Sequence, residues 1–180
     1  MGMFSSFRLG SKRINVDSLY TVIVAHSRHP VFYTVLGVPD TVNGRYEVIM
    51  LHTYVVMKRL KVIGIEASTT SQALFDLMFA DMDKNLREMG VGDLSVGKKI
   101  KAMATAYYGR IKAYDEGLEG GQELLASALR RNLFVEVKPT DQQVTGMADL
   151  LSNQVQASSS WSLVDIKKGA ISFITPPNDD

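Results

Sequence analysis

The chain of 180 residues is long enough to form one compact domain with a substantial core, and too short to divide comfortably into two. Its hydrophobic fraction of 46% and charged fraction of 22% exclude an intrinsically disordered chain. The net charge of +1 excludes a global field that would draw the chain to nucleic acid, and the lack of cysteine excludes disulfides and thiolate metal sites.

The first 15 residues contain no apolar run of signal-peptide length, and their glycine and serine content predicts a flexible lead-in before a helical domain over 16–175. Asp17 is expected to cap a first helix over 17–28, which ends before Pro30 because the residue preceding a proline is disfavoured in helical geometry. The aromatic residues and the turn-forming cluster that follow predict one helical turn and then a connector rich in turns.

Two longer helices follow this connector. The first, over 44–62, is apolar on nearly every side, which indicates an element that other elements surround. The second follows a cluster of capping residues at 68–71 and ends at Gly90, a residue type suited to the left-handed conformation that often closes a helix. Its apolar residues recur at spacings of three and four and are expected to face inward: Leu74, Phe75, Met78, Phe79, Met82, Leu86 and Met89.

The next part of the chain predicts further helices. Asp93 or Ser95 is expected to cap a helix that runs past residue 114, with its apolar residues on one face. Arginines in the last turn suit the negative end of a helix over 122–134. Thr140 and Gln143 then form a capping-box pattern, which predicts the start of another helix.

The C-terminal part predicts one short helix and one extended segment. The serines at 158–160 are expected to cap a helix over 161–169, and the residues beyond it alternate as a strand would before fraying over 176–180. The sequence contains no internal repeat. It therefore predicts an all-α fold, a single compact domain of six or seven helices with a short extended C-terminal segment.

The segment GVGDLSVGKK, residues 90–99, resembles a phosphate-binding loop, but Lys99 stands where a hydroxyl would hold Mg²⁺. A phosphate-binding loop also follows a buried strand, whereas here a helix precedes the glycines. Nucleotide hydrolysis is therefore not expected. Lys98 and Lys99 place positive charge near the start of the following helix, where the helix dipole also favours anions, and we expect an anion contact there.

Histidine and aspartate residues give no recognised metal site. His26, His29 and His52 lack neighbouring carboxylates at ligand spacing, and Asp81 and Asp83 point about 200° apart on a helix. We therefore expect no metal, no cofactor and no catalytic residue. Two alternatives stay open: a helical ligand carrier that binds haem through His52, and a Mg²⁺-dependent enzyme that uses Asp76 and Asp83.

Two long segments carry a family resemblance. HPVFYTVLGVPDTVNGRYEVIMLHTYVVMKRL, residues 29–60, and LFDLMFADMDKNLREMGVGDLSVGKKIKAMATAYYGRIKAYD, residues 74–115, resemble the ubiquinol–cytochrome c chaperone family. The resemblance covers roughly residues 18–135 and is looser beyond them. Its distinctive positions are Pro30, Phe32, Tyr33, Gly37 to Asp40, Gly44, Arg45, Leu51, His52, the run from Phe79 to Gly97, and Tyr108 to Arg110.

The resemblance implies a non-enzymatic assembly factor that binds newly made cytochrome b, or another membrane-protein client, while the cytochrome bc1 complex (respiratory complex III) is built. It also implies contacts with a small partner protein and with the ribosome, and relatives in alphaproteobacteria. No long N-terminal extension precedes the matching region, so we expect a bacterial cytoplasmic protein that works at the inner membrane surface. Recognition of a specific nucleic-acid sequence is not expected.

A chaperone for such a client needs exposed apolar side chains beside polar ones, and methionine suits a surface that receives varied partners. The chain has nine methionines. We expect Lys98 and Lys99 to attract acidic groups or lipid headgroups beside the client. The hypothesis places client contacts at Met78, Met82, Met89, Val91, Leu94, Phe32 and Tyr33.

Overall fold

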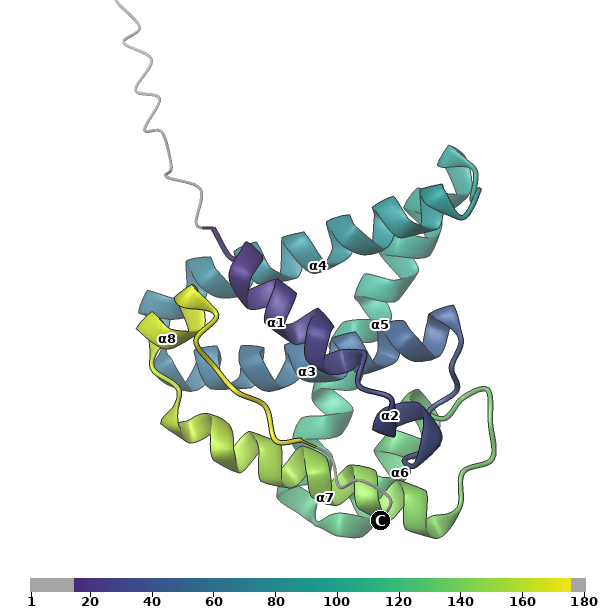
Figure 1. Ribbon diagram of the computed structural model, residues 1–180, viewed down its shortest axis with the longest axis vertical. Coiled ribbons are helices and arrows are strands. Elements are labelled where there is room, and N and C mark those ends of the chain that lie inside the picture. The colour runs from purple at the N-terminus through teal and green to yellow at the C-terminus, as the bar shows by residue number, and fades with distance from the viewer. Residues whose placement is uncertain (1–14, 176–180) are drawn as a thin grey trace, which may run out of the picture.

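The computed structural model describes residues 15–175, and the only regular secondary structure among them is helical (Figure 1). The all-α prediction is therefore confirmed. The predicted lead-in lies outside the described residues except for Asn15, and the predicted frayed tail over 176–180 lies outside them entirely. The elements are α1 (Asp17–Ser27), α2 (Val31–Thr34), α3 (Val42–Ile63), the 3₁₀ helix η1 (Ile65–Ala67), α4 (Ser68–Glu88), α5 (Asp93–Gly120), α6 (Gln122–Asn132), α7 (Asp141–Ala157), the 3₁₀ helix η2 (Ser158–Ser160) and α8 (Leu163–Lys168).

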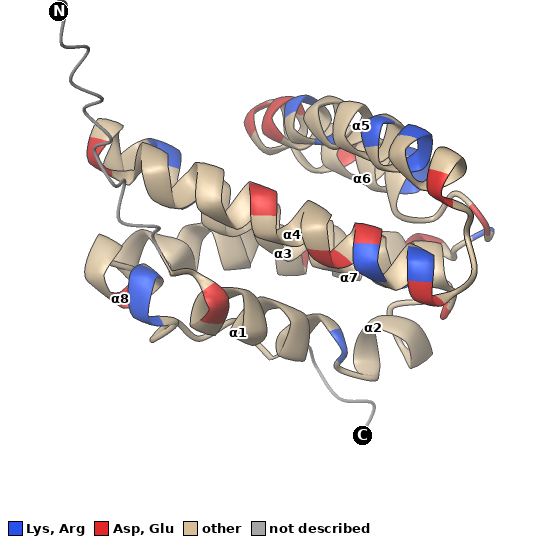
Figure 2. Ribbon diagram, turned by 90° about the horizontal axis from the view of Figure 1, so that it is seen from above, with Lys and Arg blue, Asp and Glu red and all other residues tan. Residues whose placement is uncertain are grey.

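Helix α3 forms the centre of the domain and packs against α1, α4, α7 and α8. More than half of its side chains are buried, which confirms the prediction of a helix that others surround. Figure 2 shows three layers: α5 and α6 lie on one side of α3, α4 and α7, while α1, α2 and α8 lie on the other. The continuous core therefore runs through the middle layer and contacts both outer ones.

The end of α4 and the start of α5 project from this body (Figure 1). The two helices meet at a short turn in which Gly90 has a φ of +84°, so the predicted left-handed closure of the helix is confirmed. The opposite half of α5 packs against α6, where Gly117 faces Leu125. A Cβ atom on Gly117 would come within 2.7 Å of the Leu125 Cα, so the absence of a side chain allows the two backbones to approach closely.

Side-chain caps occur at fewer helix starts than predicted. The capping box of Thr140 and Gln143 is confirmed, with Thr140 Oγ1 accepting from the Gln143 backbone N–H at 3.1 Å. Asp17 does not cap α1; the amide oxygen of Asn15 accepts from the Asp17 backbone N–H instead. The residues at 68–71 lie inside α4, which begins directly after η1 with no side-chain cap.

The caps predicted for the starts of α5 and α8 were also wrong. Asp93 and Ser95 both lie within α5, whose N-cap is Gly92, and the Asp93 carboxylate is bonded to Arg87. The serines at 158–160 form η2, and the capping box of α8 consists of Ser162 and Asp165. Local patterns identify residues able to cap, whereas the path of the preceding chain decides which one does.

No strand forms over 170–175, although alternation predicted one. A strand requires a neighbour for its backbone hydrogen bonds, and among the described residues none is extended beside it. The segment instead packs by side chains: Ile171 is buried, and Phe173 contacts the rings of His26 and Trp161. The alternation of apolar and polar residues over 170–175 therefore reflects which side chains face α1 and α3.

Two polar networks tie α3 to α5. Arg110 Nε donates to Glu47 Oε2 at 2.6 Å, and both side chains are mostly buried, with exposed fractions of 15% and 13%. Farther along, Asp115 accepts from the Tyr54 hydroxyl at 2.8 Å and from Lys58 Nζ at 2.6 Å. These contacts fix the rotation of α5 about its own axis relative to the centre of the fold.

None of the helices in the described part of the chain combines the length and the hydropathy that crossing a membrane requires.

Candidate functional site

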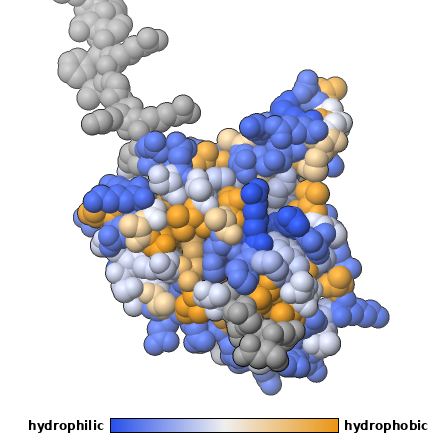
Figure 3. All heavy atoms as spheres, viewed as in Figure 1, coloured by the Kyte–Doolittle hydropathy of each residue, from blue (hydrophilic) through white to orange (hydrophobic). Residues whose placement is uncertain are grey.

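An open groove of about 270 Å³ lies between α1, α2, α3 and the last turns of α4. Its position is where the outer layer of α1 and α2 meets the projecting end of α4 (Figure 1). In the space-filling view this face carries strongly hydrophilic side chains beside hydrophobic ones (Figure 3). The apolar lining consists of Val24, Tyr33, Val42, Tyr46, Ile49 and Met89, and the polar lining of Ser27, Arg28, Arg45, Asp81, Asn85 and Glu88.

Opposite charges face each other across the groove. Arg28 directly follows α1 and Arg45 lies in α3, whereas Asp81 and Glu88 lie in α4. Arg45 is held in place by Asp40, whose carboxylate lies 2.6 Å from its Nε, and its guanidinium lies 5.5 Å from the centre of the Tyr33 ring. The arrangement suits a segment that presents apolar side chains to the floor and charged side chains of both signs to the rims.

The Tyr33 ring is fixed by a hydrogen bond that its hydroxyl donates to the Ser27 carbonyl at 2.7 Å. Burial raises the pKa of Tyr33 to about 12, so this hydroxyl stays protonated and keeps donating near neutral pH. The groove therefore has one aromatic wall whose orientation is set before any ligand arrives.

Asp81 is the fixed acidic group of the groove. Its Oδ2 accepts from the Tyr20 hydroxyl at 2.9 Å, and Asn85 donates to its backbone carbonyl at 2.9 Å. Burial, reinforced by the Asp81 charge, raises the pKa of Tyr20, which therefore remains a donor. One Asp81 oxygen is thus occupied, and the carboxylate as a whole lines the groove.

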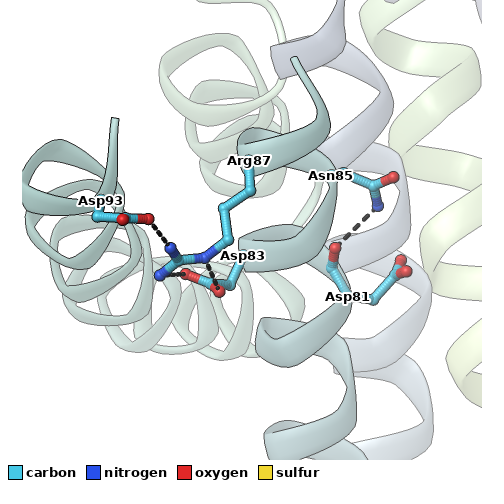
Figure 4. A network of polar contacts seen from close by, with 5 residues as sticks. All are labelled: Asp81, Asp83, Asn85, Arg87 and Asp93. Carbon is cyan, nitrogen blue, oxygen red and sulfur yellow. Dashed lines mark hydrogen bonds and ion pairs between the residues drawn. The ribbon is translucent and has the colours of Figure 1, made fainter. Parts of the chain in front are cut away.

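Figure 4 shows that Asp81 and Asp83 extend from opposite sides of α4, as their spacing predicted. Asp83 accepts from Arg87 at 2.7 Å on the side away from the groove, and Arg87 also bonds to Asp93 at the start of α5. This three-residue network joins the two helices across the projecting turn (Figure 4). Asp83 therefore has a structural role at the turn.

The Mg²⁺-dependent enzyme gains no support from these positions. Asp76 accepts from Gln72 at 2.7 Å, and Asp83 is bonded to Arg87, so each carboxylate is engaged by a neighbour on its own helix. Across residues 15–175, no cluster of three or more acidic or histidine side chains is close enough to hold a metal ion together.

The described part of the structure also has no space for a haem beside His52. His52 is buried, and its Nδ1 lies 2.8 Å from the Val48 carbonyl and 3.1 Å from Ser27 Oγ. The cavity beside it measures about 10 Å³, which is the space of a single water, whereas cofactor sites occupy hundreds of Å³. His52 is therefore a core residue held by hydrogen bonds.

His52 and His26 form the centre of an aromatic cluster with Phe32 and Phe173. The ring of Phe173 stacks on His26 at 4.9 Å and lies 5.1 Å from His52, so the segment after α8 covers both histidines. Burial lowers the pKa of His52 to about 3 and that of His26 to about 4, both from an ordinary value of 6.5.

Acid is expected to destabilise the protein through these two histidines. Below about pH 6.5 the unfolded chain binds a proton at each of His26 and His52. The folded chain binds a proton at His26 only near pH 4 and at His52 only near pH 3. The free energy of unfolding should therefore be flat above pH 7 and fall by about 1.4 kcal/mol per pH unit for each histidine below pH 6. Urea unfolding between pH 4.5 and 8 measures this slope.

A variant without the His26 imidazole tests this prediction. His26→Phe should remove part of the slope, because phenylalanine preserves the ring contacts and binds no proton. An unchanged slope in His26→Phe would contradict the assignment.

The predicted contact residues divide into accessible and buried ones. Met89 is half exposed, with an exposed fraction of 50%, and lines the groove together with Tyr33. The partly buried Val91 lies in the turn between α4 and α5, and Leu94, with an exposed fraction of 91%, lies in the first turn of α5. The remaining three, Phe32, Met78 and Met82, are fully buried in the core and have no access to a partner in this conformation.

Several groove residues were not predicted from the sequence. Tyr46 and Ile49 belong to α3, whose apolar character on nearly every side hid which face lines a groove. Asp81 did carry a usable signal: it lies three residues after Met78 and seven after Leu74, so a carboxylate interrupts the buried stripe of α4. A charged group at such a position marks either a buried pair or the wall of a site.

Known proteins resemble this chain in sequence and in structure. The model of the ubiquinol-cytochrome C chaperone family matches residues 34–173. The ubiquinol-cytochrome-c reductase complex assembly factor 1 of Xenopus laevis is 25% identical over 158 residues, which cover 87% of this chain and 79% of that protein. The mitochondrial protein CBP3 of Saccharomyces cerevisiae is 28% identical over 149 residues, covering 81% of this chain and 44% of the yeast protein.

A solved structure shares the fold. The crystal structure of the Cbp3 homolog from Brucella abortus superposes with a TM-score of 0.78 at 32% sequence identity and covers 88% of each chain. The assembly factor 1 of Mus musculus is longer, and this chain spans 57% of it at 25% identity.

Proposed function

The chain belongs to the ubiquinol-cytochrome c chaperone family, and we propose that it is a non-enzymatic assembly factor that binds newly made cytochrome b while the cytochrome bc1 complex is built. The groove between α1, α2, α3 and α4 is the observation that supports client binding most directly. Eight of its twelve lining residues fall within the region that the family model matches.

The chemistry of the groove fits a segment of a membrane protein. Such a segment has apolar side chains next to the charged residues that flank membrane spans. Tyr33, Tyr46 and Ile49 offer the apolar floor, while Asp81 and Glu88 face the place where a basic flanking residue would lie. A volume of about 270 Å³ admits a few side chains, so the groove takes the end of a hydrophobic segment while the remainder lies on the surface.

We assign the client contacts within the predicted set as follows. Tyr33 and Met89 touch the client in the groove, and Val91 and Leu94 extend the contact along the projecting turn. The buried members, Phe32, Met78 and Met82, support these residues from the core. Methionine at the rim adapts its flexible side chain to different apolar partners, which suits a chaperone.

The proposal extends to location and to further partners. We place the protein in the cytoplasm, peripheral to the inner membrane where its client inserts. The ribosome and another membrane-protein client are the further partners to test.

Site-specific photocrosslinking tests the client site. A photoreactive amino acid at position 33 or 89 should capture cytochrome b, and probes at 91 and 94 should capture it more weakly. Positions 135 and 164, which are exposed and lie outside the groove lining, serve as controls. Capture at 135 and 164 with none at 33 and 89 would place the client on another face.

Deletion of the gene tests the proposed function independently of the proposed client-binding groove. Blotting for cytochrome b and measuring assembled bc1 complex should show a loss of both. Normal assembly in the deletion strain would refute the proposed function, whereas failed crosslinking alone would refute only the groove.

A further inference from the structure

One face of α5 is exposed along most of the length of the helix. Leu94, Lys98, Lys101, Thr105, Tyr108 and Lys112 follow one another at spacings of four and three, so they form one stripe. All six are exposed, including Leu94 and Tyr108 with exposed fractions of 91% and 61%. Two lysines and a threonine thus lie between Leu94 and Tyr108 on a surface that is exposed among the described residues.

The residues beside this stripe make the face flat. Ala102, Ala106 and Gly109 are exposed on the same side of α5 and carry little or no side chain. Lys99 flanks them on the far side. We refer to this surface, from Leu94 to Lys112, as the α5 face.

The first half of the α5 face is cationic, and Lys112 at its other end is paired with Glu116. From Leu94 to Tyr114 the sequence contains four lysines and one arginine and no acidic residue. Arg110 is neutralised by Glu47 in the interior, but Lys98, Lys99 and Lys101 have no ion-pair partner within residues 15–175. In Figure 2 the basic residues of α5 lie on the outer layer of the molecule.

We propose that the α5 face binds the surface of a lipid bilayer that contains anionic lipids. The lysines match a negative headgroup layer, which attracts each nearby basic residue and falls off within a Debye length. Leu94 and Tyr108 reach the boundary between headgroups and acyl chains, where leucine and tyrosine side chains are favourable. This apolar component favours a bilayer over nucleic acid, whose backbone offers leucine nothing to contact.

The position of the α5 face suits a planar partner. The turn between α4 and α5 stands clear of the other helices in Figure 1, and Leu94 is exposed at the start of α5 directly after it. The groove is bounded by α4 rather than α5, so it stays open to a client while the α5 face is occupied. Client binding in the groove and bilayer binding therefore have separate tests, and Leu94 is the one residue that both proposals use.

Vesicle flotation with the full chain tests the proposal. Vesicles of phosphatidylcholine with about one third phosphatidylglycerol should bind the protein, and vesicles of phosphatidylcholine alone should bind it far more weakly. The triple variant Lys98→Gln, Lys99→Gln, Lys101→Gln should weaken binding on the order of 100-fold, at about fivefold per lysine. Leu94→Ser should weaken binding without changing its salt dependence.

The matched control is Lys167→Gln, Lys168→Gln, which neutralises two exposed lysines on α8, and it should bind vesicles as the natural protein does. Circular dichroism confirms that each variant is folded. The proposal is overturned if the triple variant binds anionic vesicles normally, or if neutral vesicles bind equally well. It is also overturned if the lysines are needed for binding ribosomal RNA in a gel shift while no vesicle binds.

Discussion

Arg110→Ala is expected to lower the free energy of unfolding by about 3 to 5 kcal/mol, because it leaves the Glu47 carboxylate buried without its partner. The pair is desolvated on both sides, and burial already raises the pKa of Glu47 despite the neighbouring guanidinium. Urea denaturation followed by circular dichroism measures the loss. Lys112→Ala is the matched control, because Lys112 lies on the same helix in an exposed pair with Glu116 at 3.8 Å, and it should cost less than about 1 kcal/mol.

The pH dependence of Arg110→Ala distinguishes a stranded charge from lost packing. Without Arg110, the folded-state pKa of Glu47 rises further above its ordinary value, so the folded chain binds a proton that the unfolded chain has released. The variant should therefore regain stability relative to the natural protein as the pH falls from 8 to 5.5. The double variant Glu47→Leu, Arg110→Leu should recover most of the loss at every pH, because no buried charge remains. Equal destabilisation of Arg110→Ala at both pH values would contradict the buried-charge explanation.

Val42→Trp is expected to reduce capture of cytochrome b at least about tenfold by filling the groove. Val42 lies at the start of α3 on the groove wall, and its exposed fraction of 44% lets a larger ring enter the groove without displacing the core. A tenfold loss corresponds to about 1.4 kcal/mol of binding free energy, which the loss of a few apolar contacts supplies. Crosslinking from position 89 and co-purification of cytochrome b measure the effect.

The chain offers a close control for Val42→Trp. Val164 lies in the first turn of α8, has an exposed fraction of 57% and is outside the groove. Val164→Trp should leave client capture unchanged, and both variants should unfold at the same temperature as the natural protein within a few degrees. Normal capture by Val42→Trp would show that the client does not occupy the groove.

Helical periodicity predicted most of the fold, because apolar spacing reports which residues face a core. The helix that became α4 is confirmed for this reason. The capping box at Thr140 is confirmed because it depends only on residues three apart in the chain. Periodicity does not report how many neighbours a helix has. Met78 and Met82 were expected at a binding surface, but α4 packs against α1, α3 and α5, which bury these side chains completely.

The groove could not be predicted from the sequence, for a different reason. Its walls come from four helices, and Arg28 and Asp81 approach it from elements separated by about fifty residues of chain. Their relation depends on how α1 crosses α4, which no local pattern determines. The single local signal was the carboxylate of Asp81 within an apolar stripe, and it indicated a special position without naming its partners.

Helix α5 is a rigid rod about 42 Å long at 1.5 Å per residue, and its two halves are held very differently. Close backbone contact at Gly117 and the bonds of Glu47 and Asp115 clamp the half nearer α6. The other half is braced through α4, to which Arg87 ties it. One end of α5 is therefore held by the body of the domain. Its other end packs against α4, the helix that forms one wall of the groove. The projecting tip and one wall of the groove are therefore parts of the same helix, α4.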